Sequence, residues 1–173
     1  MSLLLRLKNR GLAVLATAIP TIGERFAAGY SAQREDETVP WTPLVKPLAA
    51  STVALVTTAG VHHRDQPPYD VHDRDGDPSF RELDLGRPLE SLMITHDYYD
   101  HADADRDLNV VFPVERLREL AAAGEIGGLA ALAYGFMGHI TGTHLETLKR
   151  RSAPEVAARL KRARVDAVLL TPG

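Results

Sequence analysis

One apolar segment constrains the fold of this chain more than any other feature. Residues 52–58 read Thr-Val-Ala-Leu-Val-Thr-Thr, and Ala59-Gly60 follow directly. β-branched residues favour strands, and a glycine after such a run is a typical end signal. Since apolar residues occupy consecutive positions in this run, both faces of the strand are predicted to be buried, as in a parallel sheet.

Strands and helices alternate along the remainder of the chain. Helices are predicted to begin at Pro113, at a capping box formed by Thr143 and Glu146, and at Ser152, and Gly124 is predicted to end the first of them. Strands separated by helices predict an α/β fold, Rossmann-like or flavodoxin-like, with three layers and a mostly parallel sheet. The further strands are predicted at residues 89–95, 127–134 and 165–170, and one long polar loop is predicted at residues 61–88.

The chain is divided by sequence into an N-terminal helical segment, residues 1–38, and an α/β domain, residues 39–173. Pro20 and Gly23 interrupt the helical pattern of the first segment. The prolines from Pro40 to Pro47 favour extended backbone at the start of the second. The helical segment is expected to pack on the domain or on a partner.

Composition and charge exclude several classes of function. A formal net charge of -3 gives no basic face for nucleic acid, and no stretch approaches the roughly 20 apolar residues of a membrane span. Arg6 and Lys8 interrupt the leucine-rich start, so no secretory signal is predicted and the protein is expected to be cytoplasmic. The absence of cysteine excludes disulfides, thiolate zinc sites and cysteine nucleophiles within these residues.

Polar residues follow the predicted strands at the positions where ligands bind in open α/β sheets, beyond the carboxyl ends. Gly138 and His139 follow the third strand, and the segment from Thr171 to Gly173 follows the last. Because the carboxyl ends of parallel strands lie at one edge of a sheet, these groups are expected to converge there. The substrate-binding candidates are Thr57, Thr58, Gly60, His62, His96, Asp97, Tyr99 and Asp100.

Residues 96–101, His-Asp-Tyr-Tyr-Asp-His, also permit a metal interpretation. They resemble the H-x-H-x-D-H signature of metallo-β-lactamase-fold hydrolases, although Tyr98 stands in place of the second histidine. A zinc-dependent hydrolase using His96, Asp100 and His101 therefore stays open as an alternative. The acidic run at 103–107 lacks the glycine and the closing glutamate of a calcium loop and is interpreted as a solvated loop.

Several blocks of sequence occur in an order and spacing that carry a family resemblance. The blocks are Val39–Trp41 with Val53–His62, Gly76–Arg81, His96–Asp100, Asp107–Pro113, Leu117–Gly127 and Val165–Pro172. Together they resemble the selenoprotein subunit shared by glycine, sarcosine, betaine and D-proline reductases, over about residues 39–173. The resemblance implies an oxidoreductase subunit for reductive cleavage of the C–N bond of a small amino acid or amine.

The same resemblance implies cofactors and partners. It places a selenocysteine or cysteine nucleophile just after Gly173, so that no catalytic nucleophile lies within the chain and the chain alone is expected to be inactive. It further implies a pyruvoyl group on a partner subunit. Because a selenocysteine codon is also a stop codon, we expect the native gene to continue past residue 173 into a longer two-domain protein.

In this interpretation the candidate residues divide by role. Thr57, Thr58 and Gly60 would hold a carboxylate through hydroxyls and backbone N–H groups, and the segment from His96 to Asp100 would orient or protonate a leaving amine. A non-catalytic α/β module that binds a ligand or a partner stays open as the other alternative. A homo-oligomer is a further partner that the sequence permits.

Overall fold

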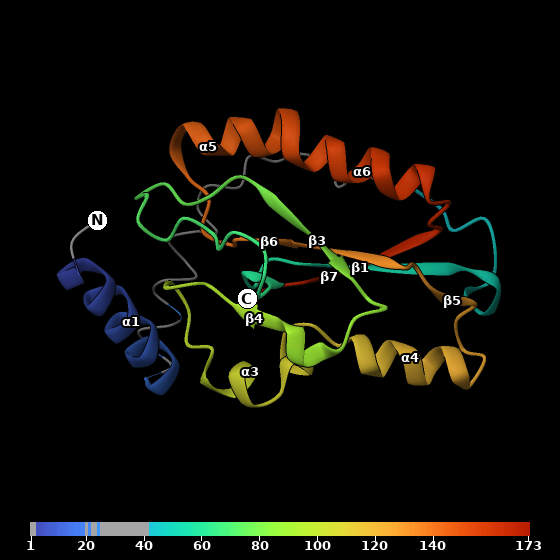
Figure 1. Ribbon diagram of the computed structural model, residues 1–173, viewed down its shortest axis with the longest axis horizontal. Helices are drawn as coiled ribbons and strands as arrows, with labels where there is room; N and C mark the ends of the chain where they lie inside the picture. Colours follow the sequence, from blue (N-terminus) through green and yellow to red (C-terminus); the bar gives the residue numbers. More distant parts are fainter. Residues whose placement is uncertain (1–2, 20, 22–23, 25–41) are drawn as a thin grey trace. The chain divides into compact units, whose positions relative to one another are not determined.

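The computed structural model describes residues 3–19, 21, 24 and 42–173 (Figure 1). Pro20, Gly23 and the Val39–Trp41 block lie outside the described residues. The structure separates into two compact units, residues 1–43 with 97–100 and residues 44–96 with 101–173. Each unit is described by itself.

The first unit contains helix α1, Leu3–Ala18, which agrees with the helical pattern predicted at the start of the chain. Arg10 Nε lies 3.5 Å from Asp97 Oδ1, so an ion pair joins this helix to the short segment 97–100 of the same unit. None of the described helices combines the length and the apolar character that crossing a membrane requires.

The second unit is built on a five-stranded sheet. Strand β1 lies inside it, with β5, β6 and β7 parallel to it and β3 antiparallel to β6. The predicted α/β class with a mostly parallel sheet is confirmed. The strands are β1 Thr52–Thr57, β3 Phe80–Asp84, β5 Gly128–Leu129, β6 Leu132–Phe136 and β7 Ala167–Thr171.

The predicted loop over residues 61–88 is wrong in two places, because it contains β2, Val61–His63, and β3. β2 pairs antiparallel with β4, Leu92–Ile94, in a separate two-stranded sheet. The strand predicted at 89–95 is therefore shorter and lies outside the main sheet. β2 is too short and β3 too polar for an apolar run to signal either strand.

Helices cover both faces of the main sheet: α5 and α6 lie on one face and α4 on the other (Figure 1). α4 begins directly after Pro113 and is followed by Gly124 at φ 75°, as predicted. The bounds are α3 Ala102–Arg106, α4 Val114–Ala122, α5 Gly142–Thr147 and α6 Ala153–Arg162, and the short 3-10 turns are η1 Leu48–Ala50, η2 Leu89–Ser91 and η3 Leu108–Val110.

The capping box predicted at Thr143 is wrong. The N-cap of α5 is Thr141, whose hydroxyl donates to Asp75 Oδ1 at 3.1 Å instead of capping the helix. The helix predicted from Ser152 is confirmed, because α6 begins at Ala153 with Ser152 at its N-cap position, although the Ser152 side chain makes no capping hydrogen bond. Ser152 also ends the π-helical turn η4, Leu148–Ser152, which joins α5 to α6.

Alternation along β1 divides its side chains between two cores. Ala54 and Val56 pack in a cluster with Val156 and Leu160 of α6. Thr57 points to the opposite face, where its hydroxyl donates to the Val111 carbonyl at 3.0 Å. The sheet is thus buried on both faces at β1, as its continuous apolar run predicts.

Candidate functional site at the carboxyl edge of the sheet

The carboxyl ends of β1, β6 and β7 lie at one edge of the main sheet. Ala59 forms an isolated bridge with Met137, so the chain segments after β1 and β6 stay side by side past the ends of both strands. Thr58 N donates to Thr171 O at 3.0 Å and links the same point to β7. We call the group Thr58, Ala59, His96, Gly138 and Gly173 the carboxyl rim.

His96 reaches this rim although β4 belongs to the other sheet. Gly60, at φ 73°, accepts a hydrogen bond from Thr95 N at 2.9 Å, which anchors the end of β4 beside the end of β1. A Cβ on Gly60 would lie 2.5 Å from Thr95 O and 3.1 Å from His96 Cβ, so only glycine permits this close approach. His96 itself is 4% exposed.

Gly138 marks the point where polar side chains converge. His96 Nε2 and Thr58 Oγ1 each lie 3.5 Å from the position that a Cβ on Gly138 would occupy. That same Cβ would lie 2.9 Å from Thr58 O, so a larger residue would crowd the space between them. An imidazole nitrogen and a hydroxyl therefore face one small region beside the end of β6.

Gly173 approaches the rim at Ala59. A Cβ on Gly173 would overlap Ala59, so the chain passes closely over the residue that follows Thr58. The rim therefore combines two side chains with hydrogen-bonding atoms and two glycines that let backbone segments approach closely.

The backbone N–H groups at the end of β1 are already used inside the protein. Thr58 N donates to Thr171 O, Ala59 N to Thr57 Oγ1 at 3.2 Å and Gly60 N to Phe136 O at 2.9 Å. The Thr57 hydroxyl is buried and bonded to Val111 O. Thr58 Oγ1, by contrast, makes no hydrogen bond to any residue that the structure describes. A carboxylate at this edge would find its donor in that hydroxyl.

His62 lies in β2 and is fully buried, with both ring nitrogens engaged. Its Nδ1 lies 2.8 Å from His63 O and its Nε2 lies 2.8 Å from Thr95 Oγ1. Burial lowers its pKa below the ordinary value, so the ring is neutral. Nδ1 then donates to the carbonyl and Nε2 accepts from the threonine hydroxyl, which makes His62 part of the framework behind the rim.

His63 is held in the same way. Asp84 N donates to its Nε2 at 3.0 Å, so the proton of the neutral ring is on Nδ1, which donates to Ser91 Oγ at 2.9 Å. Burial lowers its pKa as well, with a contribution from Arg87. The two histidines thus link β2 by hydrogen bonds to β3 and to the residues on either side of β4.

Asp97, Tyr99 and Asp100 belong to the first unit. Asp97 is 2% exposed and forms the ion pair with Arg10, and the other two are half-buried. The structure therefore describes these candidates apart from the rim, to which they are connected through His96 in sequence.

The zinc alternative finds no support in the geometry. Among the residues that the structure describes, no three His, Asp or Glu side chains gather closely enough to hold a metal ion. His101, the N-cap residue of α3, instead contacts Asp105 Oδ2 with its Nδ1 at 2.8 Å, one turn further along the helix.

A loop that sequence reasoning left without a role borders the end of β6. Asp73 Oδ2 lies 2.9 Å from His144 Nε2, and this hydrogen bond lowers the pKa of Asp73 and raises the pKa of His144. Gly76 bridges to Ile140, and Asp75 binds Thr141. No sequence signal could have paired these residues, because they lie far apart in the chain.

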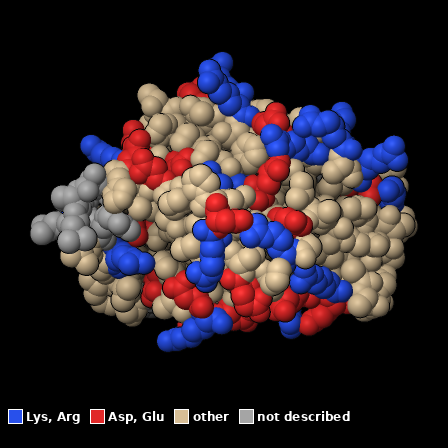
Figure 2. Space-filling model, in the orientation of Figure 1, with Lys and Arg blue, Asp and Glu red and all other residues tan. Residues whose placement is uncertain are grey.

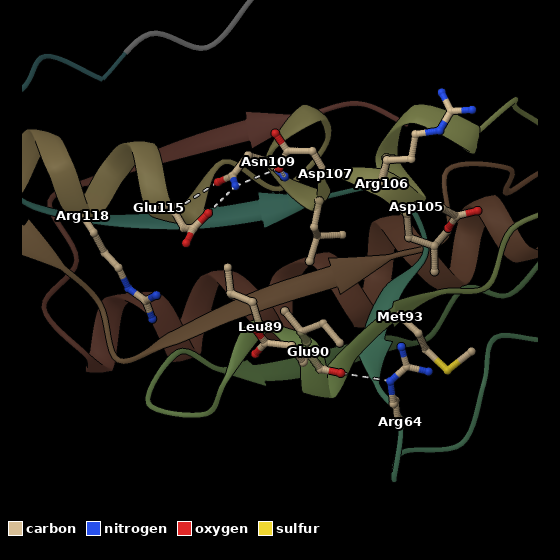
Figure 3. Close-up of a pocket in the computed structure, with 14 residues that line it drawn as sticks. Arg64, Leu89, Glu90, Met93, Asp105, Arg106, Asp107, Asn109, Glu115 and Arg118 are labelled. Atoms are coloured by element: carbon tan, nitrogen blue, oxygen red, sulfur yellow. Dashed lines mark hydrogen bonds between the residues drawn. The ribbon is translucent and has the colours of Figure 1, made fainter.

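A cavity of about 740 Å³ lies between β4, α3 and α4 (Figure 3). Asn109 Nδ2 donates to Glu115 Oε2 at 2.6 Å, Arg64 Nε donates to Glu90 O and Arg118 donates to Leu85 O. Its lining holds the three arginines 64, 106 and 118 against four acidic side chains, at positions 90, 105, 107 and 115. Because neither sign of charge dominates, the cavity offers no focus for an ionic ligand, and the candidate site is assigned to the rim.

The surface agrees with the low net charge. On the face shown in Figure 2, basic and acidic side chains are interspersed and neither covers a continuous patch.

The family described as glycine/sarcosine/betaine reductase selenoprotein B (GRDB) matches residues 7–173. D-proline reductase subunit gamma of Acetoanaerobium sticklandii is 41% identical over 133 residues, which cover 77% of this chain and 53% of that protein. No solved structure matches the chain.

Other similar proteins come from related complexes. Glycine reductase complex component B subunit gamma of Carboxydothermus hydrogenoformans is 31% identical, and betaine reductase complex component B subunit beta of Peptoclostridium acidaminophilum is 32% identical. Each alignment covers 86% of this chain and 34% of the relative. The chain therefore spans about half the length of the first relative and about a third of the other two.

Proposed function

Because the chain belongs to the glycine/sarcosine/betaine reductase selenoprotein B family, we propose that it forms the substrate-facing part of a subunit that cleaves the C–N bond of a small amino acid or amine by reduction. The convergence of His96 Nε2 and Thr58 Oγ1 on Gly138 is the observation that carries this proposal. It supplies a proton-transfer group and a hydroxyl donor at the edge where α/β proteins bind ligands.

The rim fits the redox residue that the family resemblance implies. We propose the rim as the place of that residue, because Gly173 lies in close contact with Ala59, which follows Thr58. When present, its selenol or thiol supplies the attack on the substrate α-carbon that displaces the amine. The chain's own residues would bind and orient the substrate and move the proton.

His96 is assigned the proton at the leaving nitrogen. An imidazole is the side chain best suited to donate a proton near neutral pH, and its Nε2 faces the rim. The Thr58 hydroxyl is assigned the substrate carboxylate, since the N–H groups around it are already bonded. Asp97, Tyr99 and Asp100 are proposed as further substrate-side residues on sequence grounds alone.

Partners follow from the relatives. The similar proteins are named as subunits or components of reductases, and five of them as parts of a complex component B. We therefore propose that the chain works inside a multi-subunit complex, where a partner subunit carries the pyruvoyl group.

The test uses the complex purified from its source cells. D-proline, glycine, sarcosine and betaine are supplied one at a time with a dithiol reductant, and release of the cleaved product is measured. His96→Gln is expected to lower kcat by about 100-fold or more. Thr58→Val is expected to raise KM by roughly tenfold, the value of one lost hydrogen bond.

His72→Ala is the control, because His72 is exposed and its side chain makes no hydrogen bond or ion pair with a described residue. If the native complex cleaves none of the four compounds, the proposed reaction is wrong. If it cleaves one of them and His96→Gln turns over at the native rate, the reaction stands and the role of His96 is wrong.

A further inference from the structure

The outer side of β7 ends the sheet in the described part of the chain. β7 pairs in parallel with β1 along its whole length, from Ala167 opposite Val53 to Thr171 opposite Thr57. No other strand among the described residues pairs with it. Alternate backbone N–H and C=O groups of β7 therefore point away from the sheet.

The side chains of β7 are much more exposed than their partners in β1. Val168 is 42% exposed and Leu170 is 71% exposed, whereas their register partners Ala54 and Val56 are 1% and 7% exposed. Both face the side of the sheet that α6 covers at β1. Leu169, on the opposite face, is 38% exposed, so neither face of β7 is fully covered.

This edge lacks the features by which proteins protect an open strand. The sequence of β7 is Ala-Val-Leu-Leu-Thr, with no charge and no proline. Natural edge strands carry such residues to prevent pairing with other chains. An apolar run of this kind belongs to an interior strand of a parallel sheet, covered on both faces.

The length of the relatives indicates what covers the outer side of β7. The chain spans 53% of D-proline reductase subunit gamma and 34% of the glycine reductase relative, so members of this family carry a large region that the 173 residues do not match. A region of that size is long enough to supply another strand and a helix.

From these observations we infer that β7 is an interior strand of the native subunit. A further strand of the same polypeptide pairs with its outer side, and a helix covers Val168 and Leu170 next to α6. The inference rests on family membership and not on the chemistry of the rim. The added strand would lie beside the segment from Thr171 to Gly173. Residues outside the 173 would therefore form part of the edge at which the substrate is proposed to bind.

Hydrogen exchange on the protein purified from its source cells tests the inference, with intact mass measured on the same sample. Peptides that cover β7 are expected to exchange as slowly as those of β6, at least 100-fold more slowly than the exposed segment 44–48. The polypeptide is expected to be heavier than the 18.9 kDa of these residues. Fast exchange at β7 would overturn the inference, and so would protection by a second copy or by a separate protein.

A variant pair provides an independent test in the native-length protein. Leu170→Asp is expected to lower the thermal midpoint by several degrees, because the new carboxylate would be buried under the added strand and helix. Leu120→Asp on α4 is the matched control, since Leu120 is 42% exposed and is expected to shift the midpoint little. Equal, small shifts in both variants would show that nothing covers Leu170.

Discussion

Two buried histidine sites in the second unit differ in what their ring atoms contact. His63 in β2 has one ring nitrogen accepting from Asp84 N and the other bonded to Ser91 Oγ. His96, equally buried, directs Nε2 toward Gly138 at the end of β6. Burial alone therefore does not identify a functional histidine. The two histidines differ in the region that their ring nitrogens face: those of His63 face β3 and η2, and Nε2 of His96 faces the carboxyl rim.

The largest expected effect is a loss of stability without a loss of turnover when His63 is replaced, the reverse of what is expected for His96. His63→Ala removes the acceptor of Asp84 N and the partner of Ser91 and leaves a cavity. We expect the free energy of unfolding to fall by about 2–4 kcal/mol. Turnover per folded molecule should stay within about twofold of the native rate, in contrast to the loss expected for His96→Gln.

Chemical denaturation and active-site-normalised rates measure the two quantities. His63→Gln is the matched control, because an amide oxygen can replace Nε2 as the acceptor for Asp84 N and should recover part of the lost stability. A large loss of turnover in folded His63→Ala would break the comparison, since it would place β2 in the chemistry.

The sequence predicted the central strand of the main sheet better than it predicted what the histidines beside it do. The run at 52–58 identified β1 within one residue, because a strand buried on both faces leaves a continuous apolar signal. The same signal is absent from β2, so the sequence could not show that His62 is held by Thr95. That contact depends on the antiparallel pairing of β2 with β4, which is not encoded locally.

The rim shows the same limit. Polar residues after several strands were expected to meet at one edge of the sheet. The sequence placed both Gly138 and Gly173 among the residues at that edge. The bond between Gly60 O and Thr95 N that anchors His96 there is a long-range contact. The engaged N–H groups after β1 are equally invisible in the sequence, so the choice of Thr58 Oγ1 as donor required the structure.

A second, smaller effect is a pH dependence of stability. Burial lowers the pKa of His62 and of His63, so the unfolded chain binds protons more readily, with an ordinary histidine pKa of about 6.5. Their contribution is therefore complete above pH 6.5 and is lost as the pH falls toward the lower folded values. The slope is at most about 1.4 kcal/mol per pH unit for each histidine.

Denaturation curves at pH 7.5 and 5.5 test this effect, because His63→Gln should lose less stability than the native chain over that interval. The carboxylates with lowered pKa titrate below this interval and do not interfere; they are Asp65, Asp73, Asp77, Asp107, Glu146 and Asp166. An identical slope in both proteins would mean that the His63 pKa is not lowered, and would weaken its placement in the framework.

The smallest expected effect is a pH dependence of stability from His144, in the contact with the loop beside the rim. Its sign is opposite to that of His62 and His63. The hydrogen bond to Asp73 raises the pKa of His144, so its contribution is complete below the unfolded pKa of about 6.5 and is lost as the pH rises through the raised folded value. His144→Gln should therefore be less stable than the native chain at pH 5.5 and equal to it at pH 8.5. Both side chains are partly exposed, so 1 M salt should reduce the difference at pH 5.5.

Unfolding midpoints at both pH values and both salt concentrations measure this difference, and hydrogen exchange of residues 70–77 locates it in the loop. The result bears on the comparison as a whole. If burial sets the sign for His63 and pairing sets it for His144, the two glutamine variants must shift the pH dependence in opposite directions. Shifts in the same direction would contradict this comparison, because they would mean that burial of His63 and pairing of His144 do not set the sign of the two pKa changes.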